Sequence, residues 1–130
     1  MFRKAGIDSR MKGRRIQRIE HQIQKEVSQI IIREMDDPRI GMVTITHVKV
    51  TPDLKQARIF FSTYGSYKER ESSKKTIEKS TPFIRRLLGQ RICLRYVPEI
   101  IFHYDETPAK AARIFQILEK LKREKAESHN

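Results

Sequence analysis

The chain has 130 residues, 38% of them hydrophobic, which is enough apolar content for one domain with a modest core and excludes a wholly disordered protein. Its single cysteine excludes an internal disulfide framework and favours a reducing compartment. The sequence contains no apolar run of about 18 residues, so no membrane span or membrane partner is predicted. The formal net charge of +12 indicates a polyanionic partner.

The positive charge is concentrated in three blocks. Residues 1–18 and 68–95 each carry a net charge of +6, and residues 110–130 carry +3. One charged run is usually a solvated helix face, but three separate blocks favour nucleic-acid binding. The basic N-terminus has no apolar stretch and is not a secretory signal. An organellar transit peptide is the alternative to the cytoplasmic protein that we expect.

A long amphipathic helix is predicted from Arg14 to Met35. Apolar residues recur there at the i, i+3, i+7 spacing of one helical face. They are Ile16, Ile19, Ile23, Val27, Ile30 and Ile31. We expect Asp36-Asp37-Pro38 to end this helix, because the residue before a proline avoids the helical region.

The next segments alternate with the period of two that is typical of strands. "MVTITHVKV" (42–50) slips by one position after Ile45, which predicts a bulge near Thr46-His47. "TPDLKQ" (51–56) is a predicted turn, and residues 57–63 are predicted to pair with the first strand as an antiparallel hairpin. A third strand is predicted at "EIIFHY" (99–104).

The segment between the second and third strands is too long for a simple loop and predicts two helices. The first is polar and weakly anchored, with Ile77 as its one strongly apolar residue. The second starts after a break at Ser80-Thr81-Pro82, where Thr81 is the predicted N-cap and Pro82 the first helical residue. Gly89 inside this helix costs about 1 kcal/mol relative to alanine, which indicates either close approach of another backbone or a packing constraint.

A last helix begins at a second Thr-Pro pair, with Thr107 as its predicted cap. We expect its apolar stripe to be buried against the rest of the protein. The stripe consists of Ala111, Ile114, Phe115, Leu118 and Leu121.

These elements predict an α+β fold of the KH type II kind, with the order α-β-β-α-α-β and an additional C-terminal helix. The helices are expected to cover one face of a three-stranded sheet. We expect residues 1–13 to be a flexible basic N-terminus, residues 14–121 to form a KH-like RNA-binding domain, and residues 122–130 to be a flexible tail.

The residues of catalytic chemistry do not form a recognisable constellation. The four histidines are far apart in sequence and none has a metal-ligand spacing. Cys93 is expected to be a buried structural thiol, and a carboxylate beside His103 is explained equally well by a strand that turns into a helix. Phe60 is expected to pack under a helix, although stacking on a base is the alternative. We therefore predict a binding protein that is not an enzyme and has no cofactor or metal.

KH domains clamp a sugar–phosphate backbone with a G-x-x-G loop between two helices. The corresponding junction here contains Ser80-Thr81-Pro82 instead. The N-terminus of a helix that starts at Pro82 would still present N–H groups to a phosphate, with Lys79, Arg85 and Arg86 nearby.

Three motifs resemble those of bacterial ribosome-binding factor A, over residues 14–117. They are Asp37-Pro38-Arg39, then Asp53-Leu54 followed by Ala57, and then Arg95-x-Val97-Pro98-Glu99 leading to Phe102 and Asp105. The family's kinked helix pair is marked by Ala-x-Gly, and that motif is not kept at residues 80–82.

The resemblance implies a KH type II fold and a non-enzymatic assembly factor. Members of the family bind the small (30S) ribosomal subunit, assist late maturation of 16S rRNA including its 5′ end, and are associated with growth in the cold. A partner GTPase can promote their release. We accordingly expect a cytoplasmic monomer whose partners are 16S rRNA, the 30S subunit and a ribosome-assembly GTPase.

The candidate RNA contacts lie in two of the basic blocks and at the helix junction. They are Arg14, Arg15, Arg18, Lys74, Lys75, Lys79, Ser80, Thr81, Arg85 and Arg86. The alternative function is a dimeric DNA-binding transcriptional regulator whose helix 82–92 enters a major groove.

Overall fold

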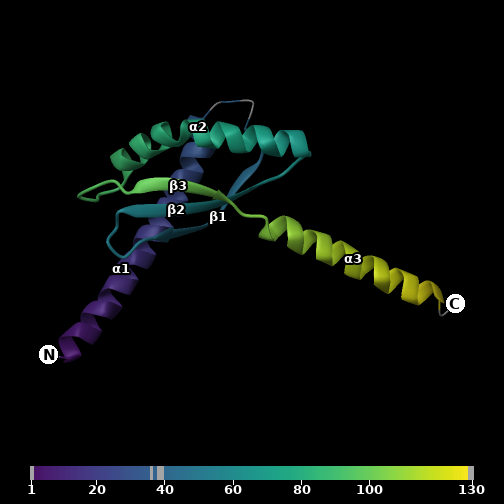
Figure 1. Ribbon diagram of the computed structural model, residues 1–130, viewed down its shortest axis with the longest axis horizontal. Coiled ribbons are helices and arrows are strands. Elements are labelled where there is room, and N and C mark those ends of the chain that lie inside the picture. The colour runs from purple at the N-terminus through teal and green to yellow at the C-terminus, as the bar shows by residue number, and fades with distance from the viewer. Residues whose placement is uncertain (1, 36, 38–39, 129–130) are drawn as a thin grey trace.

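The computed structural model describes residues 2–35, 37 and 40–128, with two helices on one face of a three-stranded sheet and a third helix that projects from it (Figure 1). The elements are α1 (Phe2–Gln29), the π-helical turn η1 (Ile30–Glu34), β1 (Val43–Val50), β2 (Gln56–Thr63), α2 (Tyr67–Arg91), β3 (Glu99–Tyr104) and α3 (Thr107–Ser128).

The sheet has the strand order β1-β2-β3, in which β1 and β2 are antiparallel and β2 and β3 are parallel. The predicted hairpin and third strand are therefore confirmed. The predicted bulge is confirmed too, since the pairing shifts between Ile45 and His47 and leaves both Ile45 and Val48 buried. Parallel strands need a long crossover connection, and α2 supplies it between β2 and β3.

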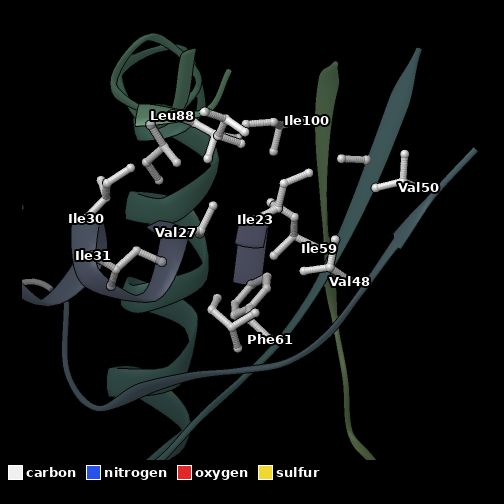
Figure 2. Close-up of a cluster of buried hydrophobic side chains, with 14 of the residues drawn as sticks. Ile23, Val27, Ile30, Ile31, Val48, Val50, Ile59, Phe61, Leu88 and Ile100 are labelled. Atoms are coloured by element: carbon white, nitrogen blue, oxygen red, sulfur yellow. The ribbon is translucent and has the colours of Figure 1, made fainter. Parts of the chain in front are cut away.

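The hydrophobic core lies between the sheet and helices α1 and α2. Figure 2 shows Ile23 and Val27 of α1 on one side of this core and Ile59 and Phe61 of β2 on the other. The apolar face predicted for the first helix is confirmed, because Ile19, Ile23, Val27, Ile30 and Ile31 are all buried. Side chains of α1 also bond the backbone of β1. Glu20 accepts from the Val50 N–H at 2.9 Å, which partly protects this edge strand.

The first helix differs from the prediction at both ends. α1 begins at Phe2 rather than at Arg14. At its C-terminal end it widens into η1, where the Met35 N–H donates to the Ile30 carbonyl at 3.2 Å. Ile30 and Ile31 of this turn are both buried. Of the expected helix terminator, Asp36 and Pro38 lie outside the described residues.

The predicted break in the second helical segment is wrong, because α2 is continuous from Tyr67 to Arg91 with Pro82 inside it. Ser66 caps this single helix by accepting from the Glu69 N–H. Thr81 is therefore not an N-cap, and its hydroxyl donates to the Ile77 carbonyl at 3.1 Å. Figure 1 shows that α2 nevertheless changes direction near its middle.

Burial explains why α2 continues through its proline. A proline in a helix interior costs about 3 kcal/mol, through a lost hydrogen bond and a clash. On the C-terminal side of Pro82, Ile84 and Leu88 are 0% exposed. Each such side chain contributes about 1.5–3 kcal/mol when fully buried, so keeping both on the core face outweighs the proline. A sequence pattern alone does not contain this balance.

The predicted burial of the last helix is also wrong. α3 projects away from the sheet (Figure 1), and the large apolar residues of its stripe are 54–64% exposed. The core face of the sheet is already covered by α1 and α2, which leaves no space there for a third helix. A hollow of about 860 Å³ separates the first turns of α3 from the ends of β1 and β2.

The start of α3 is fixed by Asp105 rather than by Thr107. The Asp105 carboxylate accepts from the Thr107 N–H at 2.9 Å and from the Thr46 hydroxyl at 2.9 Å. These hydrogen bonds, with the one to the Thr107 side chain as the largest cause, hold the pKa of Asp105 below its usual value. Asp105 therefore ties the end of β3, the bulge of β1 and the first turn of α3 together.

Candidate nucleic-acid interface

The face of α2 that points away from the core carries a row of cations. They are Lys68, Lys75, Lys79 and Arg86, called here the α2 basic stripe, and all four are exposed. Their separations of 7, 4 and 7 residues correspond to two, one and two helical turns, so they follow one line along the helix. None of the four side chains forms a hydrogen bond or an ion pair with another described residue, although Asp37 lines a small hollow together with Lys75 and Lys79.

The structure separates Lys74 from this stripe. Its ammonium group is 3.1 Å from the Glu71 carboxylate and 3.8 Å from the centre of the Tyr104 ring. Lys74 thus links α2 to β3 through partners inside the protein. Lys75 and Lys79 are exposed as expected. Lys68 was missed, although its spacing of seven residues from Lys75 already placed it on the same helical face.

The two neighbouring arginines have different environments. Arg85 donates from Nε to the Pro98 carbonyl at 3.1 Å and from Nη2 to the Val97 carbonyl at 3.0 Å. Arg85 therefore anchors the loop before β3. The Arg86 guanidinium lies over the Phe83 ring, 5.6 Å from its centre, and is otherwise directed to solvent.

Ser80 and Thr81 do not form the predicted phosphate site. That site required a helix to start at Pro82, since only the first turn of a helix has N–H groups without intrahelical partners. Residues 80–82 lie in the interior of α2. No helix N-terminus therefore exists at Pro82 to meet an anion, and the side chains of the stripe remain the candidates in this part of α2.

Arg14, Arg15 and Arg18 form a second basic surface on α1, and all three are exposed. Arg91 of α2 pairs with Glu26 of α1 at 3.7 Å and with Glu34 of η1 at 2.9 Å. Arg18 lies 8 residues before Glu26, which corresponds to roughly 12 Å of helix. The structure therefore does not bring the three arginines next to the α2 basic stripe.

A groove at the end of the stripe was also missed. It lies between the second half of α2 and the loop before β3, and its lining includes Arg86, Arg95 and Tyr96. Sequence reasoning placed Arg95 in a family motif without a role, and it had no way to position the loop against the helix.

The remaining candidate sites have structural explanations. Cys93 is exposed, so the expected burial of its thiol is wrong, because the loop after α2 turns it outward. Phe60 does not pack under a helix. It lies on the uncovered face of the sheet between the rings of His47 and His103, with centroids 4.0 and 5.2 Å away. Across the described residues, no group of three or more potential metal ligands comes together.

Fold and surface together define a class of protein. The chain is a basic α+β domain of the KH-like kind, with a row of four exposed cations along α2. Among the helices that the structure describes, none is long and apolar enough to cross a membrane.

Comparisons with known proteins identify the family. Residues 15–118 match the family model of Ribosome-binding factor A. Ribosome-binding factor A of Halothermothrix orenii is 45% identical over 114 residues, which are 88% of this chain and 93% of the relative. The same protein of Citrifermentans bemidjiense is 37% identical over 108 residues, or 83% and 91% of the two chains. The chain belongs to the ribosome-binding factor A family.

Solved structures agree on the fold. The crystal structure of ribosome-binding factor A from Thermus thermophilus superposes with a TM-score of 0.60 at 17% identity, over 68% of this chain and 94% of that chain. A homology model of the Thermus thermophilus protein, fitted into the cryo-EM map of a 30S complex, gives a TM-score of 0.58 at 17% identity over 68% and 93%. The predicted KH-like α+β fold is confirmed.

Proposed function

We propose that this protein binds the small (30S) ribosomal subunit and assists late maturation of 16S rRNA, including its 5′ end. The α2 basic stripe carries the proposal, because four exposed cations without ion-pair partners among the described residues lie in line on the face opposite the core. The protein acts without catalysis, as a cytoplasmic monomer, and a ribosome-assembly GTPase promotes its release.

The stripe suits structured RNA. α2 has 25 residues and is therefore roughly 37 Å long, which is enough to follow several phosphates of an RNA backbone. Double-stranded RNA hides its base edges in a deep, narrow major groove, and proteins bind it mainly through shape, phosphates and 2′-hydroxyls. A line of cations on a helix supplies the phosphate contacts without a need for base recognition.

The alternative function, a DNA-binding regulator, required a separate helix at residues 82–92, and the structure has no such separate helix there. A major-groove reader places a separate recognition helix into DNA. Residues 82–91 are instead the second half of α2, with Ile84 and Leu88 in the core and Arg85 bonded to the neighbouring loop. No observation favours a DNA-binding regulator over the ribosomal function.

Removal of the stripe tests the proposal. In the variant Lys68→Ala/Lys75→Ala/Lys79→Ala/Arg86→Ala, we expect weaker binding to purified small subunits and a flatter plot of log affinity against log salt concentration. Each phosphate contact contributes about 0.7–0.9 to that slope, so the slope should fall by roughly 3. Filter binding across a potassium chloride series measures both quantities.

Two control variants show whether the loss of binding comes from the charge of the stripe, from disturbed folding or from the lower net charge of the protein. The charge-conserving variant Lys68→Arg/Lys75→Arg/Lys79→Arg/Arg86→Lys should keep the slope, because the number of cations is unchanged. Loss of four cations from α3, in Lys110→Ala/Arg113→Ala/Lys120→Ala/Lys122→Ala, should change the slope less. If the salt slope of the α3 variant fell as much as that of the stripe variant, net charge and not the stripe would drive binding.

A cellular test addresses the maturation step. Deletion of the gene should cause precursor 16S rRNA with an unprocessed 5′ end to accumulate, and the stripe variant should fail to correct this defect. Normal rRNA maturation in the deletion strain, together with no subunit binding at low salt, would refute the proposed function.

A further inference from the structure

A shallow groove of about 490 Å³ lies where α2 passes the loop that precedes β3. Its lining consists of Pro82, Arg85, Arg86, Gly89, Arg95, Tyr96 and Val97. Three of these residues are arginines, and none of the described lining residues is acidic. The volume lies in the range of small-ligand sites. The charges indicate an anionic occupant, because an uncharged partner would desolvate the Arg86 and Arg95 guanidinium groups without compensation.

The groove is held in shape by the protein itself. Arg85 donates to the carbonyls of Val97 and Pro98, at 3.0 and 3.1 Å, and so fixes the loop against the helix. Gly89 allows this approach, since a Cβ built there would lie 2.7 Å from Cγ2 of Val97. A preformed groove lowers the entropy that is lost when a ligand binds.

One large aromatic ring is exposed at the groove. The Tyr96 side chain is 74% exposed, and the Arg95 guanidinium lies 5.5 Å from the centre of its ring. Exposed aromatic rings next to arginines are typical of sites for single-stranded nucleic acid, where the ring stacks on a base and the cations hold the backbone. The α2 basic stripe ends at Arg86, which also lines the groove. A phosphate backbone that follows the stripe therefore arrives at the ring.

We propose that this groove binds one unpaired nucleotide, with its base stacked on Tyr96 and its phosphate held by Arg86 and Arg95. This inference rests on the proposed function, because the nucleotide belongs to the RNA that the α2 basic stripe contacts. The stripe then provides affinity for any RNA backbone, and the groove provides a preference for a strand that leaves its helix at this point.

Fluorescence of a base analogue tests the stacking. The probe is a single-stranded hexanucleotide RNA that contains one 2-aminopurine, whose emission is quenched on stacking. We expect the wild-type protein and Tyr96→Phe to quench it, and Tyr96→Leu to lose the quenching and bind the probe about tenfold more weakly or worse. Tyr64→Leu is the matched control, because Tyr64 is 78% exposed and does not line the groove.

The salt dependence separates the ring from the cations. Tyr96→Leu should leave the slope of log affinity against log salt unchanged, since it removes no phosphate contact, whereas Arg95→Ala should lower it by roughly one unit. A thermal melt of each variant confirms folding before binding is measured.

Two results would overturn the proposal. The first is equal binding and quenching by Tyr96→Leu and Tyr64→Leu while the wild type still binds small subunits through the stripe, which would leave the proposed function intact. The second is a wild type that does not quench the RNA probe but binds polyglutamate in a way that depends on Tyr96 and Arg95, which would assign the groove to an acidic peptide. A protein that binds no small subunit at all would instead refute the proposed function.

Discussion

Gly89 lies where α2 and the loop before β3 come so close that a larger residue would collide with Val97. Glycine weakens a helix by about 1 kcal/mol relative to alanine, and it persists here because the loop before β3 passes very close. The contact is with the side chain of Val97, whose Cγ2 would be 2.7 Å from an added Cβ. The short, branched valine has no flexible end that could move aside. The two hydrogen bonds that Arg85 donates to the Val97 and Pro98 carbonyls also hold the loop in this position.

We therefore expect Gly89→Ala to lower the free energy of unfolding by about 1–3 kcal/mol, as is usual for overpacking. The loss occurs although alanine is the better helix former. Urea denaturation followed by circular dichroism measures the change.

The effect of Gly89→Ala on the free energy of unfolding should change sign once the contact with Val97 is removed. In a Val97→Ala background, Gly89→Ala should raise the free energy of unfolding, by up to about 1 kcal/mol from helix propensity. If Gly89→Ala stabilised the wild-type protein as well, the close approach of the loop would not explain the glycine.

At the scale of the element, α2 shows a bend without a break. Pro82 supplies no N–H for the Glu78 carbonyl, and Glu78 is exposed, so water can take the place of the missing donor. Helix kinks at proline arise from this lost bond and from the clash of the ring with the preceding turn. The bend lets one continuous helix keep its buried residues, from Ser73 to Leu88, on the core.

Replacement of the proline should stabilise the helix. We expect Pro82→Ala to raise the free energy of unfolding by about 1–3 kcal/mol, because alanine restores the hydrogen bond to Glu78. Chemical denaturation measures this. Unchanged or lower stability would show that packing against the sheet, and not the proline, imposes the bend.

The exposure of α3 gives a second test at this scale. Leu118→Ala should change the free energy of unfolding by no more than about 0.5 kcal/mol, because Leu118 is 54% exposed on a projecting helix. The matched control Leu88→Ala removes the same atoms from a position that is 0% exposed and should cost about 2–5 kcal/mol. Equal costs for the two variants would mean that α3 packs against the body in solution.

Local periodicity was sufficient for the hairpin, the bulge after Ile45, the third strand and the core face of α1, because one face of each packs on the same core. It failed at Pro82, where burial of Ile84 and Leu88 outweighs the cost of the proline, and along the α3 stripe, where α1 and α2 already cover the core face of the sheet. Both outcomes depend on the assembled fold, which no local pattern contains.

The candidate site was predictable in the same partial way. Exposed cations such as Lys75, Lys79 and Arg86 follow from charge and helical spacing. The intramolecular partners of Lys74 and Arg85 do not, since Tyr104 and the carbonyls of the loop before β3 come from distant parts of the chain.

At the scale of the whole molecule, the protein presents two basic surfaces on different helices. α1 carries Arg14, Arg15 and Arg18, and α2 carries the stripe. Arg91 of α2 pairs with Glu26 and Glu34, which lie 8 and 16 residues after Arg18 in α1 and η1. Two separated surfaces can contact two segments of folded RNA at once.

Because the two basic surfaces are separate, we expect their contributions to the salt slope to be additive. Arg14→Ala/Arg15→Ala/Arg18→Ala should lower the salt slope of subunit binding by roughly 2–3, and this loss should add to that of the stripe variant. Affinity measured over a salt series for each variant and for their combination provides the check. If the triple variant kept the wild-type salt slope, the α1 arginines would not be part of the RNA interface.

The position of Cys93 has a practical consequence. It is the one cysteine among 130 residues, it is exposed, and it lies two positions before Arg95 at the edge of the groove. A maleimide dye or spin label will therefore attach at a single defined place, without any engineered substitution. The protein carries its own attachment point for a reporter that senses when RNA arrives beside Tyr96 and when it departs.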